Sequence, residues 1–133
     1  MNRCVYIYFF MIGFVSDVVL QYIPSYHTSL LVPFWEEHGS LMGAVYAGLT
    51  TLIGGALLLE VLNMLQITEL CPAIVVAFLL GMVIDLLINK SQLFPSLNVW
   101  YDNIGTWEAA AWGGLALVFV QLFSIFLIKQ TDG

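Results

Sequence analysis

Three carboxylic acids lie within long apolar segments of the chain. Asp17, Asp85 and Glu108 each belong to a different segment, and no Lys or Arg lies in the interior of these segments. A charged side chain at the centre of a membrane helix costs about 2.5–3.5 kcal/mol. Each acid is therefore expected to be protonated, hydrogen-bonded, placed at an interface or bound to a cation.

The depths of these acids allow two interpretations. With a rise of 1.5 Å per residue, Asp17 lies roughly 9 Å and Asp85 roughly 5 Å inside the same membrane face, and Glu108 lies in a first turn. One interpretation is a proton or cation site, because carboxylates relay protons and hold hard cations. In the other, Asp85 and Glu108 stay ionised in the headgroup layer, and Asp17 is a neutral acid bonded to a neighbouring helix. Glu60 lies apart, nearer the opposite face.

The sequence indicates no other chemistry. Glu36, Glu37 and His38, with His27 nearby, fit no zinc-ligand spacing and are interpreted as a solvated acidic loop. No nucleophile–His–acid arrangement, phosphate-binding glycine loop or His-Glu-x-x-His motif occurs. We therefore expect no enzymatic activity, no metal centre and no cofactor.

The composition indicates what kind of structure must position these acids. The chain has 133 residues, of which 61% are hydrophobic and 9% charged, and its formal net charge is −6. A soluble domain has about 45–50% apolar and about 25% charged residues, so this chain could not cover a water-facing surface. The composition excludes a soluble enzyme, a disordered chain and, for lack of a basic patch, a nucleic-acid partner. A single integral membrane domain in contact with the lipid bilayer remains.

Four apolar segments are long enough to cross a bilayer, which takes about 20 helical residues. They cover about 4–23, 41–65, 70–88 and 107–128. Because the segments are continuously apolar rather than alternating, they indicate helices and not the strands of a membrane barrel. The sequence therefore predicts an all-α, four-helix transmembrane bundle that forms one domain over 1–133.

The connections between the segments are unequal. Two long loops, about 24–39 and 89–105, fall on one face, and the short loop at 66–69 and both termini fall on the other. The long loops are rich in aromatic residues, so both are expected to lie along the membrane, with a short helix near 30–35. The short loop predicts that the second and third spans are antiparallel neighbours. Arg3 and Lys129, against Lys90 on the loop side, predict cytoplasmic termini.

Small residues predict close packing of the second and fourth spans. In lipid, helices associate where small residues let their backbones approach. The second span has a small-residue face wide enough for two neighbours, which we expect to be the fourth span and a second subunit of a homo-oligomer. The residues expected in these contacts are Gly43, Ala44, Ala47, Gly48, Thr51 and Gly55 of the second span and Gly113 and Gly114 of the fourth.

Three segments of the chain resemble a known group of proteins. They are FWEEHG at 34–39, AVYAGLTTLIGG at 44–55 and LLGMVIDLLINK at 79–90. In this order they resemble small multi-span membrane proteins of large DNA viruses of algae and protists, over roughly residues 34–90. The resemblance implies a virion membrane or a host-derived internal membrane, with capsid or other membrane proteins as partners. It implies no catalytic residues.

Two functions are consistent with these features. The favoured one is a structural or interaction protein of a viral membrane, which contacts its partners through the long aromatic and acidic loops. The alternative is an oligomeric proton or cation channel or transporter that uses Asp17, Asp85 and Glu108. A transporter needs its acids to face a wet cavity or axis, whereas a scaffold can bury each one against a hydrogen-bond donor. The surroundings of Asp17 and Asp85 therefore separate the two.

Overall fold

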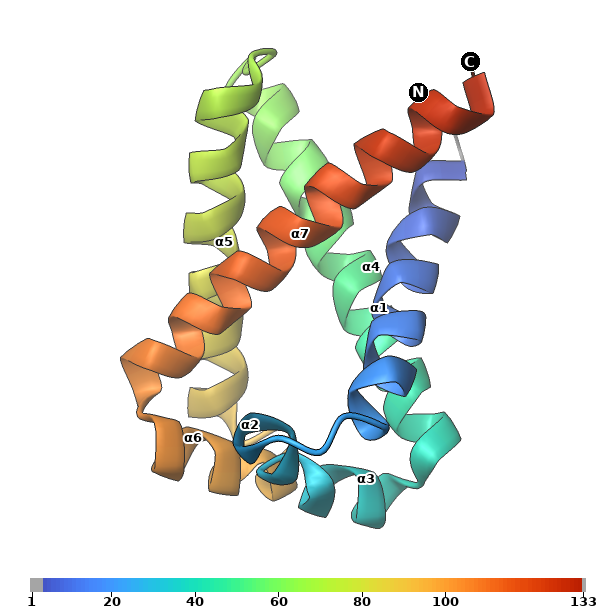
Figure 1. Cartoon of the computed structure of the whole chain (residues 1–133). Helices are drawn as coiled ribbons and strands as arrows, with labels where there is room; N and C mark the ends of the chain where they lie inside the picture. The colour runs from blue at the N-terminus through green and yellow to red at the C-terminus, as the bar shows by residue number, and fades with distance from the viewer. Residues whose placement is uncertain (1–3, 133) are drawn as a thin grey trace.

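The chain folds into four long helices joined by short ones. The structure, a computed structural model, describes residues 4–132, and this range contains no strand. The long helices run between the two ends of the molecule (Figure 1). They are α1 (Cys4–Gln21), α4 (Ser40–Met64), α5 (Leu70–Ser91) and α7 (Thr106–Asp132). The predicted all-α class is confirmed, and each long helix overlaps one of the predicted apolar segments.

Four short helices lie across one end of the long ones, opposite the α4–α5 connection (Figure 1). We call them the platform: α2 (Tyr26–Ser29), α3 (Val32–His38), the 3₁₀ helix η1 (Pro95–Leu97) and α6 (Asn98–Ile104). α3 matches the short helix that was predicted near 30–35. Gly39 and Gly105 follow α3 and α6 with φ angles of 88° and 96°, which glycine adopts without strain. These glycines let the chain turn from the platform into α4 and α7.

Three of the long helices are long and apolar enough to cross a membrane, as judged by length and composition over the described residues. They are α4, α5 and the Thr106–Gln130 part of α7, whereas α1 supplies only the shorter apolar stretch Val5–Gln21. Three of the four predicted spans thus correspond to helices that could cross a membrane, and the crossing itself stays a prediction. α1 ends two residues before its predicted boundary because Pro24 disfavours helical geometry in the residue before it. Arg3, on which the predicted orientation partly rests, lies outside the described residues.

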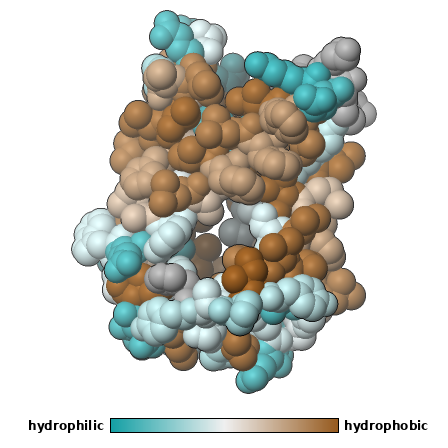
Figure 2. Space-filling model, in the orientation of Figure 1, coloured by the Kyte–Doolittle hydropathy of each residue, from teal (hydrophilic) through white to brown (hydrophobic). Residues whose placement is uncertain are grey.

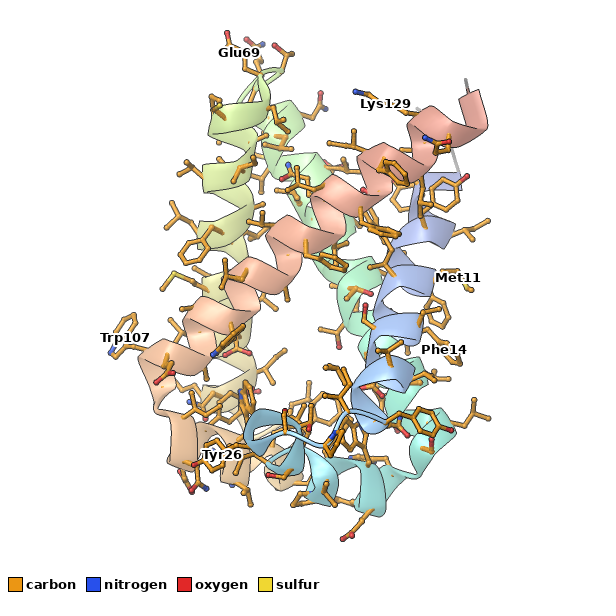
Figure 3. All side chains as sticks on the ribbon, viewed as in Figure 1. Met11, Phe14, Tyr26, Glu69, Trp107 and Lys129 are labelled. Atoms are coloured by element: carbon orange, nitrogen blue, oxygen red, sulfur yellow. The ribbon has the colours of Figure 1, made fainter. Side chains whose placement is uncertain are left out.

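The outer faces of the long helices are apolar. Figure 2 shows hydrophobic residues over most of one side of the molecule and hydrophilic residues mainly at its two ends. Met11 and Trp107 point away from the bundle, and Glu69 and Lys129 lie at the end opposite the platform (Figure 3). Apolar residues are exposed at intervals of four along two helices: Ile7, Met11, Val15 and Val19 on α1, and Val75, Leu79, Val83 and Leu87 on α5. Such a surface is typical of a protein that contacts lipid.

The long helices pack as two pairs. α1 lies against α4 and α5 lies against α7, and each of these interfaces is far larger than any contact between the pairs. α4 and α5 were predicted as neighbours, but they diverge from their short connection toward the platform (Figure 1). α7 crosses from α5 at the platform end to α1 at the other end (Figure 1). A common core that includes Phe9, Leu58 and Leu117 joins the pairs where α7 crosses.

The small-residue face of α4 is covered by α1 and α3. A Cβ atom added to Gly48 or Gly55 would collide with Phe10 or Phe9 of α1, and Gly43 lies beneath side chains of α3. The expected neighbour on this face was the fourth span, and in its place the structure has α1. The reason lies in Gly13 of α1, which lets the two backbones approach. Because the face is already covered, it no longer argues for a second subunit.

The two halves of the chain are similar in sequence and in arrangement. Each half contains a long helix, short platform helices, a glycine with positive φ and a second long helix. The first half is residues 4–64 and the second half is residues 70–132. Residues of α1 and α5 correspond as follows: Phe10 and Phe78, Gly13 and Gly81, Val15 and Val83, Asp17 and Asp85, and Gln21 and Asn89. Residues of α4 and α7 that correspond include Ser40 and Thr106, Ala44 and Ala110, Gly48 and Gly114, and Leu49 and Leu115.

Corresponding glycines make corresponding contacts in the two halves. A Cβ atom on Gly48 would lie 2.8 Å from the Phe10 ring. A Cβ atom on Gly114 would lie 2.9 Å from the Phe78 ring. Contacts this short show that each interface depends on glycine at this position. The halves are therefore structural repeats, and because each contains two long helices, they run in the same direction through the bundle (Figure 1).

Candidate functional site

Two adjoining cavities lie between the helix pairs, and together we call them the interior cavity. The larger has a volume of about 240 Å³ and is bounded on one side by the platform, and the smaller has a volume of about 180 Å³. Thr50, Thr51, Asp85 and Ile88 line both, so the two cavities meet beside Asp85. Figure 2 shows the surface hollowed between α7 and the platform. The interior cavity is thus lined by residues of both halves of the chain and is open on one side.

The interior cavity brings together two of the three predicted acids. Asp17 and Asp85 line its larger part from opposite halves. Glu108 is exposed in the first turn of α7 and lines neither part. Glu60 is exposed on α4, also away from the cavity. The candidate site therefore contains one acid from each repeat, at corresponding positions.

The Asp17 carboxylate is held by two hydrogen-bond donors. The side chain is buried; Trp35 Nε1 of α3 donates to Oδ1 at 3.1 Å, and Gln21 Nε2 donates to Oδ2 at 3.0 Å. Gln21 Nε2 also donates to the Ser40 backbone oxygen at 3.1 Å, and the Ser40 hydroxyl is bonded to the Gln21 side chain. Asp17 therefore ties α1 to α3 and, through Gln21, to α4. The bonds to neighbouring helices agree with the structural interpretation of Asp17, and its neutral state stays a prediction.

The Asp85 carboxylate has different surroundings. Its Oδ2 atom is buried and has no hydrogen-bond partner in the part of the chain that the structure describes. Asn89, which corresponds to Gln21, is shorter by one methylene, and its Nδ2 lies 3.5 Å from Thr106 Oγ1. A buried polar atom without a partner costs about 1–3 kcal/mol, and more when it is charged. Asp85 is therefore the polar group of the cavity that most needs a proton or a ligand.

Tyr101 of α6 corresponds to Trp35 of α3, and both line the larger cavity. The Tyr101 side chain is buried. Burial raises the pKa of the Tyr101 phenol, and the nearby Asp85 carboxylate raises it further. The phenol therefore stays neutral beside Asp85 and adds no second negative charge to the cavity.

An aromatic cluster closes the cavity on the platform side. Phe34, Tyr46 and Phe94 line the larger cavity, and their ring centroids lie 5.5–6.4 Å apart. His38 packs on the same rings, with its centroid 4.8 Å from that of Phe34, and its buried Nε2 has no hydrogen-bond partner within the described chain. The prediction of a solvated loop is therefore wrong for His38, because the turn at Gly39 directs α3 against α4.

The remaining residues of the predicted acidic loop are solvent-exposed or undescribed. Glu36 and Glu37 are exposed, as a solvated loop requires, and Glu37 Oε2 lies 4.0 Å from His38 Nε2. The side chain of His27 lies outside the described residues. Within the described residues, no group of three or more His, Cys, Asp or Glu side chains could hold a metal ion.

The platform residues of the site were not predicted from the sequence. Trp35 and Tyr101 were assigned only to interfacial loops, although they lie beside Asp17 and Asp85. The internal repeat is the signal that could have found them. Aligning Asp17 with Asp85 and Gly39 with Gly105, which takes a gap of two residues in the second half, places Trp35 opposite Tyr101. Such an alignment marks all four positions as equivalent pairs and uses nothing but the order of the residues.

Comparison of the chain with protein-family models, with curated proteins and with solved structures finds no match. The resemblance to viral membrane proteins therefore stays a prediction. The assignment of function depends on the geometry of the interior cavity. It is a concave, mostly apolar space between two repeats with a few convergent polar groups, which is the usual form of a small-ligand site.

Proposed function

We propose that the protein crosses the membrane four times, with α1 as the fourth span. The repeat supports this, because α1 corresponds to α5, which is long and apolar enough to span a membrane. The 18 residues of α1 rise about 27 Å, close to the hydrocarbon thickness of about 30 Å. The exposed apolar stripes of α1 and α5 also occupy corresponding positions. The platform then lies at one membrane face and the α4–α5 connection at the other.

We propose that the protein is a transporter that takes up a cation, a proton included, at Asp85 in the interior cavity. The observation that carries this proposal is the buried Asp85 Oδ2 without a partner among the described residues. No described Lys, Arg or His side chain lines either part of the cavity, so no positively charged side chain there compensates Asp85, and a proton or a bound cation would supply that charge. In secondary transporters, sites of this kind lie at the interface between internal repeats.

A flux measurement in proteoliposomes tests this function. Wild type, Asp85→Asn and Glu108→Gln are reconstituted, and the fluxes of protons, K⁺ and choline are measured under an imposed gradient. We expect wild type to conduct at least one of these cations faster than empty liposomes. Asp85→Asn removes the ionisable group with little change in shape, so the flux should fall to background. Glu108→Gln, outside the cavity, should retain it. Equal flux in wild type and Asp85→Asn would refute the proposal.

A structural or interaction role in a viral membrane is the second candidate. Exposed acids on the platform side support it, since they form a surface that suits a basic partner such as a capsid layer. They are Glu36, Glu37, Asp102 and Glu108. If this role is right, the protein is present in purified virions, and Glu36→Lys with Glu37→Lys lowers its incorporation. Its absence from purified virions would exclude the viral role.

A further inference from the structure

The lining of the interior cavity indicates which class of cation it takes, an inference that rests on the proposed function. We propose that the cavity binds a small organic ammonium ion with alkyl groups on its nitrogen, in preference to a metal ion. One carboxylate provides the charge, and aromatic rings provide the remaining contacts. Three features support this preference: the supply of oxygen ligands, the aromatic walls and the side from which the cavity is reached.

The cavity supplies too few free oxygen atoms for a metal ion. Hard cations such as Ca²⁺ take about six to eight oxygen ligands. Both carboxylate oxygens of Asp17 already accept hydrogen bonds. Thr50 Oγ1 and Thr51 Oγ1 donate their protons to backbone oxygens at 2.8 and 2.7 Å, so each could offer a metal ion one neutral oxygen at most. Among the described residues that line the cavity, Asp85 is the one carboxylate with a buried oxygen that has no hydrogen-bond partner.

Most of the remaining wall is aromatic. Five rings line the larger cavity: Phe34, Trp35, Tyr46, Phe94 and Tyr101. The faces of aromatic rings attract cations, and quaternary ammonium ions are recognised in this way in proteins. Such an ion needs one counter-charge and no shell of oxygen ligands. The neutral phenol of Tyr101 beside Asp85 fits this role, because it offers a ring without adding charge.

The size and surroundings of the cavity limit the ligand further. Its two parts, of about 240 and 180 Å³, together lie at the lower end of the roughly 300–1,000 Å³ of pockets for drug-sized molecules, so the ligand is small. The hollow in Figure 2 lies between the helix pairs, with hydrophobic residues above it and to its right and more hydrophilic residues of the platform below it. A hydrated metal ion would lose its water there at high cost, whereas an alkylated ammonium ion carries apolar groups of its own. Lateral entry therefore suits the organic ion.

Calorimetry on the full chain in lipid nanodiscs tests this inference. The probe is choline, and its control is 3,3-dimethylbutan-1-ol, which has the same shape with carbon in place of the charged nitrogen. We expect choline to bind wild type and Glu108→Gln alike, and Asp85→Asn at least tenfold more weakly. The neutral alcohol should show no binding, and Na⁺, K⁺ and Ca²⁺ should not displace choline.

A second set of variants keeps the test valid if Asp85→Asn fails to fold. Asn89→Gln lengthens the side chain that corresponds to Gln21, so it should donate to Asp85 and weaken choline binding. Tyr101→Phe keeps the ring and should retain binding, whereas Tyr101→Leu removes the ring and should lose it. Loss of binding in Tyr101→Leu with an unchanged melting temperature separates a ligand contact from a structural one.

Each alternative outcome has a distinct meaning. Binding of a metal ion or a proton at Asp85 without choline would overturn this inference and leave the proposed transport function in place. Equal binding of choline and the neutral alcohol, or choline binding that ignores Asp85→Asn, would also overturn it. If no cation and no proton depends on Asp85, both the inference and the proposed function are wrong.

Discussion

The two halves of the chain hold equivalent acids in different ways. In the first half, Asp17 accepts hydrogen bonds from Trp35 and Gln21. In the second half, the buried Oδ2 of Asp85 has no partner among the described residues. The backbones around both acids are similar, since each acid lies four residues after a glycine that contacts the paired helix. The difference therefore arises from a few side chains and not from the fold.

The side chain one turn after each acid accounts for much of this difference. Gln21 is long enough to reach both Asp17 and Ser40. Asn89 is shorter by one methylene, and its amide lies 3.5 Å from the Thr106 hydroxyl. One repeat thus uses its acid to connect helices, and the other leaves its acid available. Both halves contain the acid, so its presence alone does not mark a functional site. What distinguishes Asp85 is that its surroundings differ from those of Asp17.

The largest expected effect is the loss of stability when the packing of a helix pair is disrupted. The loss should be similar in the two halves. A Cβ atom on Gly13 would lie 2.6 Å from the Ala47 carbonyl oxygen, and one on Gly81 would lie 2.6 Å from that of Gly113. Because backbone cannot yield locally, Gly13→Leu and Gly81→Leu should each cost more than about 3 kcal/mol. The measurement is the fraction of monodisperse protein after heating in detergent.

Gly54→Ala is the matched control for these glycine substitutions. The added Cβ atom would lie 3.5 Å from Leu117 and 3.7 Å from Ile84, which are ordinary contacts. We therefore expect nearly wild-type stability. If Gly81→Leu is tolerated as well as Gly54→Ala, the α5–α7 interface is not packed as described, and the correspondence of the halves is wrong.

The next effect separates the two acids directly. Asp17→Leu leaves the Trp35 N–H without an acceptor and removes one of the two acceptors of the Gln21 amide, so it should destabilise the protein by about 2 kcal/mol or more. Asp85→Leu removes an atom that has no partner within the described chain, so it should leave stability unchanged or raise it. Melting temperatures in the same detergent measure both. A similar loss in the two variants would show that Asp85 has a donor.

The helices were predictable from the sequence, and their partners were not. Continuous apolar segments define where α4, α5 and α7 lie, and Pro24 limits α1. Hydropathy does not say which face of a helix meets which neighbour. The short loop therefore suggested that α4 pairs with α5, whereas the interface glycines pair α4 with α1 and α5 with α7. Trp35 reaches Asp17 only because Gly39 turns α3 under the bundle, a consequence of three-dimensional arrangement that no local pattern contains.

A smaller effect is expected from exchanging the residues that distinguish the repeats. Asn89→Gln should bring a donor to Asp85 and stabilise the protein by roughly 0.5–1.5 kcal/mol, the net value of one hydrogen bond. Gln21→Asn should lower stability by a similar amount, because the shorter amide cannot reach both Asp17 and Ser40. Gln130→Asn, an exposed position on α7, serves as the control and should change little. Opposite signs for the two exchanges support the comparison, and equal signs contradict it.

The smallest effect is a change in the alkaline titration of Tyr101. Burial and the Asp85 carboxylate hold the pKa of its phenol above the usual value of 10.0. Stability from the neutral phenol is therefore complete below about pH 10, where tyrosine of the unfolded chain ionises, and is lost as the pH rises further. Asp85→Asn removes one of the two causes, so the Tyr101 pKa should fall, whereas Asp17→Asn should not change it. Phenolate absorbance measures the shift, and subtracting the titration of Tyr101→Phe isolates this group. An equal change of the Tyr101 pKa in Asp85→Asn and Asp17→Asn would show that the two acids do not differ at this site.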